Sequence, residues 1–156
     1  MINKYHDLTI EKYIELYEFD IYGMEEIDIQ SNIIAILADM TVDEVLDLPI
    51  TEYKKMAQQT AFMRQPPQVK PRRISNITIN GKEFNVLDRI ESMTAGQYID
   101  YQTYIQKGDV KMLPYILSCL IIPKGEKYGD SDTIEDIKQM SVEEALTISN
   151  FFMKFW

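Results

Sequence analysis

The sequence predicts a mainly α-helical fold with a small β-hairpin, built from two similar helical modules that a Pro-rich linker joins. Three observations support this. Apolar residues recur at helical spacing behind Ser or Thr N-cap residues, one Asn-Gly pair separates two β-favouring runs, and one stretch is rich in proline. We therefore expect a helical module over residues 1–65, the linker and hairpin over 66–92, and a second helical module over 93–156, together forming one compact unit.

The first module is expected to hold a capped helix, an apolar helix, a short capped helix and a longer terminal helix. Thr9 can cap a helix over residues 10–19, whose apolar side chains follow the i, i+3, i+4, i+7 spacing of one face. Thr41 and Glu44, three positions apart, make a capping box for the short helix. The acidic stretch 22–30, YGMEEIDIQ, breaks the helical pattern, so we expect a loop or a short extended piece there.

The linker and the hairpin follow. Residues 64–71, RQPPQVKP, cannot continue a helix because proline removes backbone donors and fixes φ. Asn80 and Gly81 then separate two β-favouring runs, and both residue types accept the positive φ of a tight hairpin turn. Because an isolated hairpin is only marginally stable, this one is expected to pack on the helices or on a partner.

The second module repeats the helical pattern. Thr94 with Gln97 predicts one capping box, and Ser141 with Glu144 predicts another before the last helix. Between them lies the apolar run 115–123, YILSCLIIP, which we expect to be helical.

The two modules match each other in order. A shift of 85 positions places residues 8–19, LTIEKYIELYEF, on residues 93–104, MTAGQYIDYQTY, with three identities at matched apolar and capping positions. A shift of 92 positions places residues 42–48 on 134–140. Internal duplication is our interpretation. The alternative is that capped amphipathic helices resemble each other because few patterns make one.

The net charge of −9 is unevenly distributed, with −8 in residues 1–65, +2 in 66–92 and −3 in 93–156. Direct nucleic-acid binding is not expected, because neutralising phosphates requires a broad basic surface. We see no signal peptide and no apolar run long enough for a bilayer span, and the single Cys119 gives no disulfide framework. These features favour a soluble, cytoplasmic protein.

Residues that could carry catalysis are sparse. The one histidine, His6, lies in a polar stretch near the start, whereas Cys119 lies in an apolar run, so a Cys-His pair is not expected. The acidic cluster in residues 130–136 lacks the spacing of a calcium loop, and no glycine-rich phosphate loop or zinc spacing occurs. We therefore expect no enzyme, no cofactor and no metal, with a carboxylate-based enzyme as a distant alternative.

Two regions are candidates for partner binding. The last helix is apolar on two sides, so Phe151, Phe155 and Trp156 are candidate anchors for another chain, unless the helix is simply central to the bundle. The basic residues Arg72 and Arg73 of the linker, with Lys82 of the hairpin, are the second candidate. They could meet an acidic lobe of a neighbouring copy or a strand edge of a partner, or belong to a solvated linker.

Short S/T-x-E-E helices, the LT helix opening and the MTAGQYID opening after the hairpin resemble small morphogenesis proteins of tailed bacteriophages. The resemblance is to tail assembly chaperone-like proteins and to minor virion or baseplate components. It implies a non-enzymatic protein that binds other phage structural or assembly proteins, such as a tape-measure or tail protein, with homo-oligomers also allowed. It implies no catalytic residues, and a place in the host cytoplasm or the virion. The alternative function is an acidic regulatory adaptor that binds a basic partner protein.

Overall fold

The computed structural model describes residues 1–154, without the side chain of Lys154, and it confirms a mainly helical fold with a small sheet. The helices are α1 (Ile10–Glu18), α2 (Glu26–Ala38), α3 (Val42–Leu46), α4 (Ile50–Gln59), α5 (Ala95–Lys107), α6 (Leu113–Ser118), α7 (Ile134–Lys138) and α8 (Val142–Lys154). The strands are β1 (Asn76–Ile79), β2 (Lys82–Val86) and β3 (Ile121–Pro123). Short 3-10 turns are η1 (Tyr5–Asp7), η2 (Thr60–Arg64), η3 (Ile90–Ser92) and η4 (Val110–Met112).

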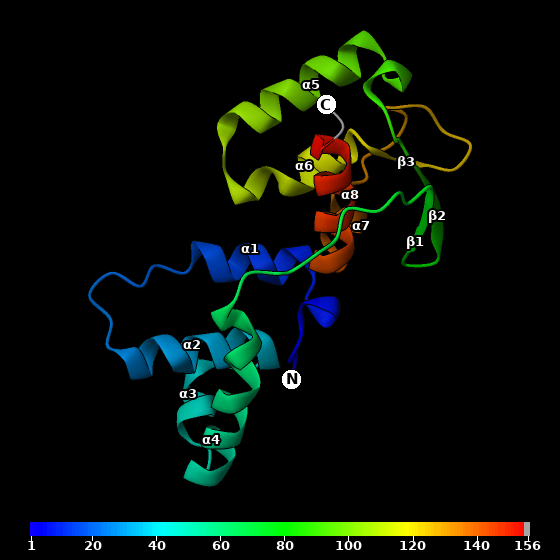
Figure 1. The fold of residues 1–156 in the computed structure, drawn as a ribbon. Helices are drawn as coiled ribbons and strands as arrows, with labels where there is room; N and C mark the ends of the chain where they lie inside the picture. Colours follow the sequence, from blue (N-terminus) through cyan, green and yellow to red (C-terminus); the bar gives the residue numbers. More distant parts are fainter. Residues whose placement is uncertain (155–156) are drawn as a thin grey trace.

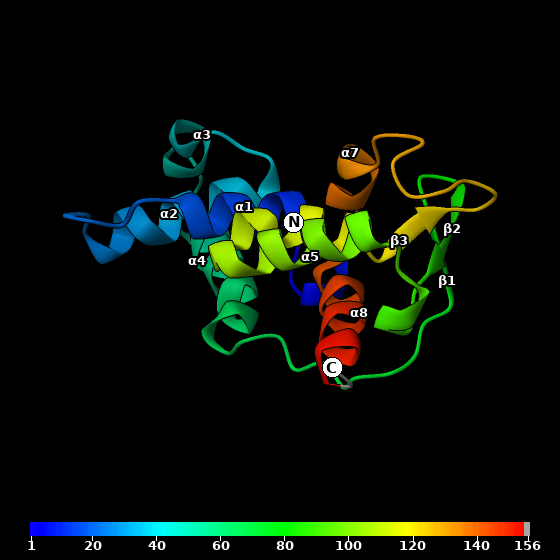
Figure 2. The same cartoon turned by 90° about the horizontal axis from the view of Figure 1, so that it is seen from above.

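The helices lie on two sides of α1. Helices α2, α3 and α4 form a lobe on one side, and the remaining helices with the sheet lie on the other (Figure 1). A second view shows the sheet at the end of the molecule away from that lobe (Figure 2). The linker, residues 65–75, runs as an irregular arm from η2 to β1 and so connects the two ends.

The predicted N-caps form. At four helices the N-cap hydroxyl accepts the backbone N–H three residues later; the pairs are Thr9 and Lys12, Thr41 and Glu44, Thr94 and Gln97, and Ser141 and Glu144. Thr41 and Thr94 make complete capping boxes. Hydrogen bonds from the backbone and side chain of Thr41 lower the pKa of Glu44. These bonds satisfy backbone donors that a helix start otherwise leaves unpaired.

Helix α2 begins earlier than the sequence pattern predicts. Residues 26–30, expected to be a loop or extended piece, form its first turns. The carboxylates of Glu26 and Asp28 suit the positive end of a helix. Ser31 donates back to the Ile27 carbonyl at 2.7 Å. The stretch that breaks the helical pattern therefore includes the exposed start of a helix.

The hairpin forms as predicted, and it gains a third strand. Asn80 and Gly81 have φ of 50° and 78° between the antiparallel strands β1 and β2. Strand β3 then pairs with the other edge of β2, giving the order β1-β2-β3. The expectation of a helix over 115–123 is wrong for its last residues, because α6 ends at Ser118. The β-branched residues Ile121 and Ile122 favour the strand where the edge of β2 is available.

Among the described residues, the buried ones form one large cluster and two smaller ones. The large cluster joins α5, α6, α7, α8 and the sheet to Ile10 of α1. Within it the rings of Tyr101 and Phe152 meet edge to face, with centroids 5.2 Å apart. Leu8, Leu37 and Val142 form a second cluster, which joins the beginning of the chain to α2 and α8. The third lies inside the lobe of α2, α3 and α4.

Helix α8 is central to the large cluster. Six of its side chains are buried, and they point in several directions around the helix: Val142, Ala145, Thr147, Ile148, Ser149 and Phe152. Between residues 142 and 153 only Glu143 and Met153 are exposed. For these residues the structure therefore favours the interpretation that the helix is apolar on two sides because it is central to the bundle.

The two halves of the chain share one order of helices. The short helices α3 and α7 begin 92 positions apart, at Val42 and Ile134. The helices that follow, α4 and α8, begin at Ile50 and Val142, which is the same spacing. The halves differ at the second helix, because α2 has 13 residues whereas α6 has 6 and is followed by β3. Internal duplication stays a prediction that this shared order supports.

Candidate partner-binding surfaces

The single cysteine and the single histidine have separate partners. Cys119 is fully buried, and its Sγ lies 3.4 Å from the Tyr115 carbonyl and 3.6 Å from the Tyr128 hydroxyl. Burial raises the pKa of this thiol, which opposes formation of a thiolate nucleophile. His6 lies in η1, with Nδ1 3.8 Å from a carboxylate oxygen of Glu143. The two residues therefore do not form the nucleophile and base pair considered from the sequence.

The acidic cluster at residues 130–136 is used for turns and helix starts. Asp130 accepts the Lys127 backbone N–H at 2.8 Å, and Asp132 accepts that of Ile134 at 3.0 Å. Each of these carboxylates closes a short stretch of its own backbone. Within residues 1–154, no three His, Cys, Asp or Glu side chains are arranged to hold a metal ion. In the same range no helix is long and apolar enough to cross a bilayer.

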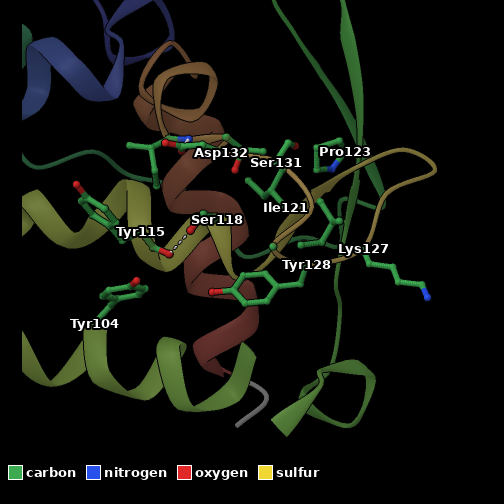
Figure 3. Close-up of a pocket in the computed structure, with 13 residues that line it drawn as sticks. Tyr104, Tyr115, Ser118, Ile121, Pro123, Lys127, Tyr128, Ser131 and Asp132 are labelled. Carbon is green, nitrogen blue, oxygen red and sulfur yellow. Dashed lines mark hydrogen bonds between the residues drawn. The ribbon is translucent and has the colours of Figure 1, made fainter. Parts of the chain in front are cut away.

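A small pocket of about 220 Å³ lies between α5, α6 and the loop over residues 124–133. The rings of Tyr104, Tyr115 and Tyr128 border it, while the ammonium group of Lys127 points away (Figure 3). The Tyr128 hydroxyl donates to Asp100 at 2.8 Å, so the polar group of this wall is already paired. Burial, together with hydrogen bonds to Cys119 and Asp100, raises the pKa of Tyr128. The contacts of Tyr128 thus tie the loop to α5 and α6.

The basic residues predicted to bind a partner lie along the arm and the hairpin. Arg72 and Arg73 line an open groove of about 860 Å³ beside β1. Arg73 forms an ion pair with Asp88 at 2.6 Å, and Lys82 forms one with Asp136 of α7 at 2.7 Å. Arg72 is exposed and has no ion pair among the described residues. Two of the three predicted cations therefore have partners within the chain, and the third lies free on the arm.

The predicted apolar anchors divide between described and undescribed residues. Phe151 is half-buried on α8. Phe155 and Trp156 lie outside the described residues. The adjacent Phe152 is fully buried in the large cluster.

A mostly apolar groove of about 410 Å³ lies between α1, the α5–α6 connection and α8. We call it the apolar groove. It is lined by residues of all three walls: Tyr13 and Tyr17 of α1; Tyr104, Ile105, Gly108, Asp109, Val110, Leu113 and Ile116 of the α5–α6 segment; and Leu146, Ser149 and Met153 of α8. Tyr17 and Met153 remain 64% and 52% exposed, so this surface is open to solvent.

The walls of the apolar groove are held by specific contacts. Gly108 ends α5 in the left-handed conformation, with φ of 62°, and turns the chain into η4. Lys111 of η4 pairs with Glu18 of α1, which ties the two walls together. The Tyr13 hydroxyl donates to that of Tyr17 at 3.2 Å, and burial raises the pKa of Tyr13. The ion pair therefore links α1 to the α5–α6 connection, and the tyrosine pair lies within the α1 wall.

A second groove of about 530 Å³ lies on the opposite face of α1, toward α2. We call it the acidic groove, because Glu15, Glu18 and Asp39 line it. Asp39 accepts the Lys12 ammonium at 2.5 Å, while Glu15 has no ion pair among the described residues. Helix α1 thus separates an apolar surface from an acidic one.

Comparisons with protein-family models, curated proteins and solved structures give no match for this chain. What it can bind is therefore judged from its own surfaces. The apolar groove has a mostly apolar lining with a few polar groups, which is the usual character of a binding groove.

The sequence pattern alone did not point to the apolar groove. Tyr13 and Tyr17 have the spacing of a buried helical face. Only the fold shows that the side chain of Tyr17 is exposed to solvent. One signal was available in the sequence. The pair Gly108-Asp109 predicts a turn between the apolar residues of α5 and those of α6. The location of α1 across that turn depends on long-range packing.

Proposed function

We propose that this chain is a non-enzymatic binding protein whose apolar groove receives an amphipathic helix of a partner protein. The observation that carries the proposal is the apolar groove itself, with three walls from distant parts of the sequence and a mostly apolar lining. A helix that offers apolar side chains at i, i+3, i+4 and i+7 fits such a groove. Each large apolar side chain that becomes buried contributes about 1.5–3 kcal/mol before ordering costs are subtracted.

The partner class follows from the sequence resemblance to morphogenesis proteins of tailed bacteriophages. On that basis the bound helix belongs to a phage structural or assembly protein, such as a tail or tape-measure protein. The chain acts as an assembly chaperone or as a minor virion component. A binding role needs no catalytic residue, cofactor or metal, which agrees with the paired states of Cys119, His6 and the acidic cluster.

An acidic adaptor is the second candidate function. The observation that favours it is the stretch of residues 13–53, which has eleven acidic residues and no Lys, Arg or His. Such a surface can attract a basic protein by charge alone. The two candidates differ in the surface that matters, because an adaptor of this kind binds without the apolar groove.

Co-purification of the tagged chain with individually co-expressed tail and tape-measure proteins tests the proposal. One such protein should be retained by the natural chain and lost with the double variant Tyr17→Glu and Met153→Glu, which places two charges in the groove. The control is Ile99→Glu, because Ile99 is 62% exposed on α5 and does not line the groove. Retention by both variants, or failure of every candidate to bind, would contradict the proposal.

A further inference from the structure

We infer that the helix bound in the apolar groove carries a row of basic residues along one edge, which lies over α1 on the acidic groove. This inference rests on the proposed function and names the chemistry of the partner segment. It comes from the arrangement of the two grooves on either side of α1.

The two faces of α1 differ in chemistry because of their spacing along the helix. Tyr13 and Tyr17, four residues apart, lie on the apolar groove. Glu15 and Glu18 lie on the acidic groove. A partner helix that packs in the apolar groove therefore contacts apolar groups there. Its side chains that extend across α1 meet the carboxylates of the acidic groove. An amphipathic helix with lysine or arginine beside its apolar stripe matches that order.

The chain neutralises only part of the negative charge at this end of α1, because Glu18 and Asp39 have ion pairs whereas Glu15 has none among the described residues. The last turn of α1 has no basic residue, although the carbonyl end of a helix favours cations. The nearby cations already have partners, since Lys12 bonds Asp39 and the Ile36 carbonyl and Lys111 pairs with Glu18. A basic edge on a partner would supply the missing charge.

The exposed apolar surface continues past the end of α1. Beyond Tyr17, the loop before α2 exposes Ile21, Tyr22 and Met24, with Tyr22 93% exposed. Asp20 precedes these residues and Glu25 and Glu26 follow them, and all three acids are also exposed. This mixture of apolar and acidic groups extends the character of both grooves. It gives a partner helix contacts over a longer path than the apolar groove alone offers.

Two other occupants fit less well. An acidic amphipathic helix would place like charges against Glu15 and Asp20, which disfavours binding. A second copy of this chain carries a net charge of −9, so like charge opposes its approach to these carboxylates. The basic arm of a second copy has one of its arginines, Arg73, already paired with Asp88.

Synthetic helices labelled with a fluorophore provide the test, with binding to the full chain followed by fluorescence anisotropy. The first probe has leucine at helical spacing and lysine elsewhere, and the second has the same leucines with glutamate elsewhere. The third scrambles the leucine-lysine composition so that no apolar stripe remains. We expect the amphipathic lysine helix to bind at least about tenfold more tightly than either other probe.

Protein variants separate the two surfaces. Tyr17→Glu with Met153→Glu should abolish binding of the lysine helix. Glu15→Gln with Asp20→Asn should weaken it and reduce its dependence on salt. The matched control, Asp47→Asn with Glu52→Gln, makes the same change of charge at two exposed positions, one directly after α3 and one in α4, and should leave binding unchanged. Circular dichroism of each variant establishes that it remains folded.

Each remaining outcome has a definite meaning. Equal groove-dependent binding of the lysine and glutamate helices would overturn the inference and leave the proposed function standing. Equal binding of the scrambled lysine probe would overturn it in favour of attraction by charge alone. Self-association that the groove variant abolishes would make a second copy the occupant and overturn it as well. Binding of every helix that ignores the groove variant would overturn the proposed function itself.

Discussion

Thr9 and Ser141 lie side by side as the N-cap residues of the first and last helices. They form an isolated antiparallel bridge. The Ile10 backbone N–H donates to the Met140 carbonyl at 2.9 Å, and the Val142 N–H donates to the Leu8 carbonyl at 2.8 Å. These two N–H groups belong to first helical turns, where the helix itself offers no acceptor. The start of α8 is therefore fastened to the start of α1, and this places Leu146 opposite Tyr13 in the apolar groove.

This bridge predicts shared protection of two amides from hydrogen exchange. We expect the Ile10 and Val142 amides to exchange with similar free energies, close to that of global unfolding, because either can open only if α1 separates from α8. Native-state exchange measured by NMR at several denaturant concentrations checks this. A much lower free energy of exchange for one of the two amides would contradict this, because it would show that one amide opens without the other.

A Gly→Ala substitution should have opposite effects on stability at Gly81, in the hairpin turn, and at Gly96, in α5. Gly81→Ala should destabilise the protein by about 1–2 kcal/mol, because Gly81 has φ of 78°. Gly96→Ala should instead stabilise it by about 0.5 kcal/mol, because Gly96 lies in the first turn of α5 and a Cβ added there would meet no atom within 4 Å. Denaturant unfolding of both variants measures the difference. Equal effects would argue against the left-handed turn at Asn80 and Gly81.

The central position of α8 predicts a sharp contrast between neighbouring residues. Phe152→Ala should cost about 3–5 kcal/mol, since Phe152 is fully buried against Tyr101. Met153→Ala should change the free energy of unfolding by no more than about 0.5 kcal/mol, because Met153 is largely exposed. Chemical denaturation gives both values. A mild effect at Phe152 would mean that α8 is peripheral.

Tyr101 predicts a loss of stability at alkaline pH. Burial raises the pKa of Tyr101 from 10.0 to about 12, and the nearby Cys119 adds to the effect. Between these pH values the unfolded chain has lost this proton while the folded chain keeps it, so the free energy of unfolding falls as pH rises. Below about pH 10 the contribution is fully present. Urea unfolding at a series of pH values should show a shallower decline for Tyr101→Phe, and identical declines would contradict the assignment.

Local signals predicted much of the fold. The caps at Thr9, Thr41 and Thr94 depend on residues three positions apart, and the turn at Asn80 and Gly81 depends on two residues, so each can be recognised without knowing what packs nearby. The boundaries fixed by tertiary contacts were not predictable in this way. Strand β3 exists because β2 offers an edge to it, and the helical start of α2 was hidden by exposed isoleucine at position 27.

The candidate site was less predictable than the fold. The basic arm was visible in the sequence, but the pairing of Arg73 with Asp88 and of Lys82 with Asp136 needed the fold. The apolar groove joins α1 to segments about 90 to 140 positions away, so no local pattern could show it. The acidic character of residues 13–53 was readable, yet its place beside the groove follows only from the location of α1.

The central claim is that the apolar groove is the partner-binding surface, and chemical-shift mapping by NMR tests it most directly. On titration with the leucine-lysine helix, the largest shift changes should fall on residues of the three groove walls, including Tyr13, Ile105 and Leu146. Changes of intermediate size should follow at Glu15 and Asp20. Shift changes confined to the arm and hairpin, around Arg72 and Lys82, would contradict the claim.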